Sequence, residues 1–166
     1  MLELYKVPAG QHRSKGRRFI IPKYTFIVEL DESCQQAPNK SWNKIAGFSD
    51  GLFHHRNSCR VVVRWLEDIG TYEFAGYAYN RGKWNAKHLL YINPVDGRVR
   101  VIFHLSYDMS DYYISFTHVL GMTTCENSEI KIERSINRSL IKYQLFPYFG
   151  GQDPAIRDWN VKINWI

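Results

Sequence analysis

Cysteine is scarce in this sequence, and its spacing argues against two kinds of site. The chain has three cysteines, Cys34, Cys59 and Cys125, and no two of them form a CxxC pair. An odd number of widely spaced cysteines suits neither a disulfide framework nor a zinc knuckle. We therefore expect folding in a reducing compartment, without a metal or another cofactor.

Long apolar stretches are also missing. No apolar run approaches the roughly 20 residues that span a bilayer, and the opening MLELYKVPAGQHRS lacks the hydrophobic region of a secretory signal. No long stretch repeats apolar residues at i, i+3, i+4 and i+7 either. The sequence predicts a soluble, unexported protein with no membrane span and only short helical turns.

Aromatic residues are plentiful, and they alternate with other residues. Tyr, Phe and Trp make up 15% of the 166 residues, and hydrophobic residues make up 45%, which is enough for one packed domain. From Tyr24 to Leu30, every second side chain is apolar and falls on one side of an extended chain. Similar patterns predict strands over 60–65, 71–79, 87–92, 98–105, 111–118, 140–149 and 159–166.

The breaks between these strands are short and suited to tight turns. Asn80-Arg81-Gly82 and Asp68-Ile69-Gly70 are two examples. Sequential hairpins of about eight strands predict a sandwich or a barrel. The polar stretches 33–43 and 123–138 are expected to be long loops.

The net charge of the chain says little about its binding partner. The chain has 22 Lys and Arg against 16 Asp and Glu, a formal charge of +6, but the basic residues are scattered. Their one cluster, residues 12–18, predicts a basic N-terminal arm over residues 1–18 that is solvated or contacts another subunit, with a nucleic-acid contact as the alternative. Arginines alternate along two predicted strands, but no nucleic-acid-binding motif is present, so we expect no nucleic-acid partner.

The segment GFSDGLFHHRNSCR, residues 47–60, has too many polar and turn-forming residues for a core strand. We expect a loop here, with His54 and Asn57 at one end of the fold. Neighbours such as His54 and His55 point to opposite faces of a strand, so both could bind one metal only if the chain bends. Asp50 is a conceivable third ligand, but no HxH or HExxH spacing supports it, and we expect no metal.

Two chemistries compete for the polar residues around this segment. A uronate lyase needs a group that neutralises the carboxylate and a base, whereas a glycan-binding surface needs only exposed aromatic faces with hydrogen-bonding neighbours. Packing in the core is the alternative for each tyrosine. The candidate ligand-binding residues are Asp50, His54, His55, Asn57, Arg60, Arg64, Tyr77 and Tyr79. No base has a recognisable partner set and no strand carries the paired carboxylates of a glycosidase, so we expect no catalytic residue.

Four motifs stand together in this chain: HRS with RF at 12–19, ELDESC at 29–34, the run from GFSD to VVVRW at 47–65, and PYFGG at 147–151. Together they resemble a family of uncharacterised proteins from Bacteroidetes and their phages, which are similar to the concanavalin A-like jelly roll of lectins and some polysaccharide lyases. The resemblance implies a single antiparallel β-sandwich of jelly-roll type over residues 1–166. The two glycines of PYFGG also predict either a backbone position with positive φ or a close approach to another segment, and we expect contact with the GFSD segment.

One position departs from the pattern of the family. There, PYFGG is followed after a few residues by Ala-Pro-His-Asp, whereas residues 154–158 read PAIRD here, and Arg157 replaces the histidine. If that histidine acts in catalysis or metal binding, the role is lost in this chain.

The phage members of the family favour a non-enzymatic structural or decoration protein of a tailed-phage virion, which could also bind glycans. Such a subunit would fold in the host cytoplasm and contact other virion subunits or itself. A carbohydrate-active enzyme, lyase or hydrolase, is one alternative. A secreted glycan-binding protein whose signal has been removed is another.

Overall fold

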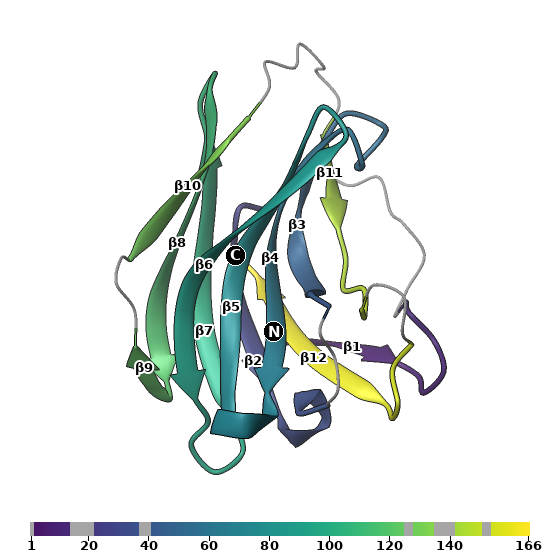
Figure 1. The fold of residues 1–166 in the computed structure, drawn as a ribbon, viewed down its shortest axis with the longest axis vertical. Coiled ribbons are helices and arrows are strands. Elements are labelled where there is room, and N and C mark those ends of the chain that lie inside the picture. The colour runs from purple at the N-terminus through teal and green to yellow at the C-terminus, as the bar shows by residue number, and fades with distance from the viewer. Residues whose placement is uncertain (1, 14–21, 37–40, 125–127, 135–141, 151–153) are drawn as a thin grey trace.

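The computed structural model describes residues 2–13, 22–36, 41–124, 128–134, 142–150 and 154–166. Within these ranges, two antiparallel six-stranded sheets pack face to face as a β-sandwich (Figure 1). The all-β sandwich predicted from the alternating pattern is confirmed. Neither short helix in the described part of the chain has the length or apolar composition to cross a membrane.

The first sheet runs in the order β1, β12, β2, β7, β8, β10. Its strands are β1 (Glu3–Val7), β12 (Trp159–Trp165), β2 (Thr25–Leu30), β7 (Val99–Tyr107), β8 (Asp111–Leu120) and β10 (Glu129–Glu133). The second sheet runs β11, β3, β4, β5, β6, β9. Its strands are β11 (Lys142–Leu145), β3 (Asn43–Asp50), β4 (Asn57–Leu66), β5 (Thr71–Asn80), β6 (Lys83–Asn93) and β9 (Met122–Thr124). Two 3-10 turns, η1 (Glu32–Cys34) and η2 (Glu67–Ile69), join strands.

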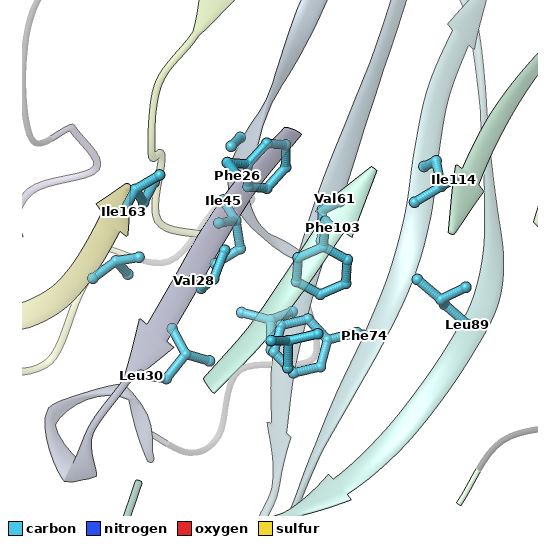
Figure 2. Packing of buried hydrophobic residues seen from close by; sticks show 14 of the residues in the cluster. Phe26, Val28, Leu30, Ile45, Val61, Phe74, Leu89, Phe103, Ile114 and Ile163 are labelled. Atoms are coloured by element: carbon cyan, nitrogen blue, oxygen red, sulfur yellow. The ribbon is translucent and has the colours of Figure 1, made fainter. Parts of the chain in front are cut away.

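The core lies between the two sheets and is built from alternate residues of their strands. Figure 2 shows Phe26 and Phe103 of the first sheet packed with Val61 and Phe74 of the second. The rings of Phe74 and Phe103 have centroids 5.3 Å apart. Each such buried side chain stabilises the fold by about 1.5–3 kcal/mol relative to an exposed one. Trp65 packs against this core, as its position in the alternation predicted.

The eight predicted strands are all present, with ends shifted by a few residues, but four other strands lie where loops or an arm were expected. Residues 43–50 form β3, although the prediction placed a loop over 33–43 and from 47 onward. Residues 129–133 form β10, and its alternate Ile130 and Ile132 pack on the core, within the stretch predicted as a loop. Residues 122–124 form β9, and 3–7 form β1 inside the predicted arm, whose residues 14–18 lie outside the described ranges.

The hairpin that joins β5 to β6 fixes which residues of these strands face each other. Arg81 and Gly82 both have positive φ, 51° and 84°, as in the two-residue turns that suit the twist of paired strands. This turn places Tyr79 opposite Trp84 and Tyr77 opposite Ala86.

Candidate functional site

The second sheet carries a separate apolar cluster on the side that faces away from the core. Val61 and Val63 of β4 point into the sandwich, so the alternate residues Arg60, Val62 and Arg64 point outward. Val62 packs there with Ala75 and Tyr77 of β5, and Trp42, Tyr79 and Ala86 cover them. We call this side the outer face.

An aromatic row occupies one part of the outer face. Tyr77 and Trp84 stack with centroids 5.7 Å apart and planes 6° apart. The Tyr77 hydroxyl donates to the Tyr79 hydroxyl at 3.4 Å. The ring of His55 meets Tyr79 edge-on at 5.2 Å, and the ring of His54 lies 3.9 Å from that of His55. Because Trp84 is 61% exposed, the row is open to solvent at the β5–β6 hairpin.

Two cations lie beside this row. Nζ of Lys44 is 5.5 Å from the ring centroids of both Tyr77 and Tyr148, and it donates to the carbonyl of Gly150 at 3.4 Å. Arg60 is buried and lies opposite Tyr77 in the β4–β5 register. Burial and the charge of Arg60 lower the pKa of Lys44 from 10.5 to about 8. Burial and the hydrogen bond to Tyr79 raise the pKa of Tyr77.

The position of Lys44 depends on the PYFGG segment. Lys44 exchanges two backbone hydrogen bonds with Tyr148, of 2.8 and 2.9 Å, and Asn43 Oδ1 accepts from the Gly150 amide at 2.7 Å. Gly150 has φ 65°, in line with its predicted need for positive φ, and Gly151 lies outside the described residues. PYFGG therefore contacts β3 at Asn43 and Lys44, a few residues before GFSD, and the contact with GFSD itself stays a prediction.

The other part of the outer face holds a carboxylate, that of Glu73, which is bonded by two neighbouring side chains. Glu73 accepts from Arg64 Nε at 2.6 Å and from His88 Nδ1 at 3.1 Å. The Arg64 guanidinium lies over Trp42, 4.5 Å from the ring centroid, and the ring of His88 lies 4.2 Å from Tyr91. The predicted site residue Arg64 thus lies on the same face as Arg60 but is already held by a carboxylate.

Asp50, in contrast, is not on the outer face. It is 2% exposed and lies on the inner side of β3, where Arg134 Nε and Nη2 donate to its Oδ2 at 2.7 and 2.5 Å. Lys142 pairs with Oδ1, and the Tyr112 hydroxyl donates to Oδ2 at 3.3 Å. This carboxylate links the two sheets from within the sandwich, and a role for Asp50 in ligand binding stays a prediction.

The two histidines and Asn57 lie at one end of the sandwich. His54 and His55 are in a turn, as predicted, while Asn57 begins β4. Asn57 Oδ1 accepts from the amide of Arg81 at 3.3 Å, and the amide of Gly82 donates to the Arg56 carbonyl at 3.2 Å. Asn57 thereby helps to dock the β5–β6 hairpin on the histidine turn. Among the described residues, no group of three or more His, Cys, Asp or Glu is arranged to hold a metal ion.

Arg157 lies at the opposite end of the strands. Its guanidinium donates to the carbonyls of Glu32 and Gln35 at 2.9 and 3.0 Å, around η1. Glu32 lies near the turn after β6, since a Cβ added to Gly97 in that turn would touch it. The histidine turn instead bonds Gly82, just before β6, at the other end of this strand. The departure at Arg157 therefore does not touch the outer-face residues around Arg60 and Tyr77.

Lys44, Trp84 and Tyr148 were not among the predicted site residues. The hairpin signal at Asn80-Arg81-Gly82 could have placed Trp84 opposite Tyr79. Lys44 carries no such signal, because a bulge between Lys44 and Ala46 interrupts the alternation of β3.

No family model matches the chain, and no curated protein matches it. Among solved structures, it is similar to a bifunctional GH43-CE protein of Bacteroides eggerthii, at 11% identity and a TM-score of 0.49. The alignment covers 97% of this chain and 21% of that one, so the chain spans about a fifth of the length of the solved protein. A similarity this low assigns neither an activity nor a ligand.

Proposed function

We propose that the outer face binds glycans, and that the protein does so as a non-enzymatic structural or decoration subunit of a tailed-phage particle. The parallel stack of Tyr77 and Trp84 is the observation that carries glycan binding. Flat aromatic faces lie against the apolar faces of sugar rings, and Trp84 leaves most of its surface to solvent.

Polar groups beside the stack suit the hydroxyls of a sugar. His55 and Tyr79 border it on the side of the hairpin, and Lys44 borders it on the side of β3. A few hydrogen-bonding groups around an aromatic platform give orientation, while the platform supplies contact area.

Glycan binding is tested by removing the exposed ring. Trp84→Ala should weaken binding to the best ligand of a glycan panel by about tenfold or more, since stacked aromatic anchors contribute a large share of such contacts. The matched control is Met109→Ala, which removes an exposed apolar side chain from the β7–β8 turn. Equal affinities of the two variants would contradict the proposal.

The virion role is supported by the sequence resemblance to phage proteins. A particle that repeats one subunit would also turn many weak glycan contacts into strong attachment. Mass spectrometry of purified particles tests this role directly. Recovery of the protein only as free material in the lysate would contradict it.

A second candidate function, elimination of an acidic polysaccharide, is favoured by one observation. The pKa of Lys44 is lowered to about 8, so its neutral amine is accessible as a base. The amine would take the proton next to the sugar carboxylate, a carbon–carbon double bond would form, and the glycosidic C–O bond would break. The leaving oxygen would take its proton from the Tyr79 hydroxyl.

The lyase is tested by incubating the protein with alginate, glucuronan and heparin and following the ultraviolet absorbance of unsaturated ends. Activity that is lost in Lys44→Met and retained in a His54→Ala, His55→Ala variant would establish this chemistry. Absence of product at high protein concentration would leave binding as the function.

A further inference from the structure

Lys44 and Arg60 place two positive charges next to the aromatic row, and this arrangement says more about the ligand than the row alone. The β3 bulge lets Ile45 and Ala46 both turn into the core, so Lys44 and Gly47 face outward. Lys44 then lies beside Val62, one outward position along β4 from Arg60. Both cations border Tyr77.

The described surroundings of Lys44 are aromatic and neutral rather than acidic. Its ammonium meets the faces of Tyr77 and Tyr148 and one carbonyl oxygen, that of Gly150. The causes that shift its pKa are burial and Arg60, with no carboxylate among them. Glu73, the acid described on this face, is held by Arg64 and His88. Among the described residues, therefore, no carboxylate pairs with Lys44 in competition with an incoming anion.

We infer that Lys44 and Arg60 form an anion subsite within the outer face, so that the bound glycan is an acidic one whose carboxylate or sulfate group lies between these cations while a neighbouring sugar ring lies on Trp84. This inference rests on the proposed glycan-binding function and names its ligand class. Arginine presents a planar set of donors that matches an oxyanion, and a lysine adds a point charge beside it. Partial burial strengthens both interactions, because the effective dielectric is lower than in water.

Anion binding and the lyase reaction should depend on pH in opposite ways, because they use different protonation states of Lys44. An anion favours the charged form of Lys44, so affinity should fall as pH rises through 8. A lyase that used the neutral amine as base would gain activity over the same range. Among the described residues, the other titratable groups that border Lys44 are Arg60, Tyr77 and Tyr148. The pKa of Tyr77 is raised, which keeps it neutral in this range.

The experiment measures affinities of the full chain for alginate, heparin and neutral glucan oligosaccharides of matched length by calorimetry. Lys44→Met should weaken binding of the acidic ligands by about tenfold and binding of the neutral ligand much less, since only the anion loses a charge-assisted hydrogen bond. Alginate carries carboxylates alone, whereas heparin carries both carboxylates and sulfates, so binding of heparin but not of alginate would identify sulfate as the group that is bound. The control Lys162→Met removes a lysine from the first sheet, where it pairs with Glu29, and should change neither.

The outcomes distinguish this inference from the proposed function. Suppose that Trp84→Ala weakens binding of every glycan, whereas Lys44→Met weakens acidic glycans no more than neutral ones. The outer face then binds glycans, but the anion subsite is wrong. If no glycan binds, both proposals fail. Tighter binding of a single-stranded oligonucleotide than of either acidic glycan would overturn the ligand class. A readout in the wild-type protein is the Lys44 side-chain NMR signal, whose pKa should rise above 8 when alginate or heparin is added.

Discussion

Arg134 of the segment after β10 binds Asp50 of β3 through two nitrogens, Nε at 2.7 Å and Nη2 at 2.5 Å, and so joins the two sheets at one end of the sandwich. Both side chains are almost fully buried, and Lys142 pairs with the second carboxylate oxygen. Within the described part of the chain, one carboxylate thus pairs with two cations that are largely shielded from water.

Asp50→Asn should therefore destabilise the protein strongly. The change removes the carboxylate charge with which both Arg134 and Lys142 pair, and breaking a buried pair from one side costs about 3–5 kcal/mol. The measurement is the free energy of unfolding in urea. The control is Asp158→Asn, because Asp158 pairs with Lys6 at the surface, where an ion pair contributes less than about 1 kcal/mol. Similar losses in both variants would show that the Asp50 network is solvated.

Gly47→Ala should also destabilise the protein strongly, because Gly47 lies where β3 and β4 approach closely. A Cβ at this position would come within 2.0 Å of the Cys59 carbonyl oxygen and 2.6 Å of the Arg60 Cα. These are backbone atoms, so the strands must separate, and we expect a loss of about 3 kcal/mol in the free energy of unfolding.

Gly70→Ala is the matched control for this substitution. Gly70 has φ 61° with nothing within 4 Å of an added Cβ, so the change costs only left-handed strain of about 1–2 kcal/mol. A loss at Gly47 no larger than the loss at Gly70 would contradict the close approach.

The parts of the fold that the sequence predicted are those with regular alternation and local turns. The β4 residues Val61, Val63 and Trp65 stand at every second position, and the pattern shows which way they point. Strand β3 was predicted as loop because its bulge breaks the alternation. Its polar last residue, Asp50, is also buried by partners distant in sequence, on β8, after β10 and on β11. Alternation cannot reveal pairing of this kind.

For the candidate site too, the sequence predicted part of the residues and missed those whose position depends on distant segments. Arg60, Tyr77, Tyr79 and His55 were predicted from residue type, and the structure brings them to one face. Lys44 was missed because its environment depends on residues more than a hundred positions later in the chain, at 148–150. Its lowered pKa is a property of tertiary burial, which no local pattern encodes.

Arg157→His should leave glycan binding unchanged. The arginine holds the carbonyls of Glu32 and Gln35 at the end of the sandwich opposite the histidine turn. A shorter imidazole would lose these hydrogen bonds and lower the free energy of unfolding by about 1 kcal/mol. Affinity for the best glycan ligand, measured alongside stability, should match the wild-type value. A change in affinity with intact folding would place this end of the sandwich in the binding site.

The pH dependence of stability should carry a signature of Lys44. Its folded-state pKa of about 8 lies below the ordinary 10.5 of an unfolded chain. Below pH 8 the ammonium is charged in both states, and its burial beside Arg60 weakens the folded state in full. Between pH 8 and 10.5 the unfolded chain binds more protons, so this residue makes the free energy of unfolding rise with pH.

Lys44→Met removes that contribution and no other titrating group. The difference in free energy of unfolding between wild type and Lys44→Met, measured in urea at a series of pH values, should be constant below pH 8 and should then shift in favour of the wild type up to about pH 10.5. The tyrosines near Lys44 are present in both proteins, so their contributions largely cancel in the difference. A difference that stays flat across this window would mean that Lys44 keeps its ordinary pKa, and that neither burial nor Arg60 acts on it as the geometry requires.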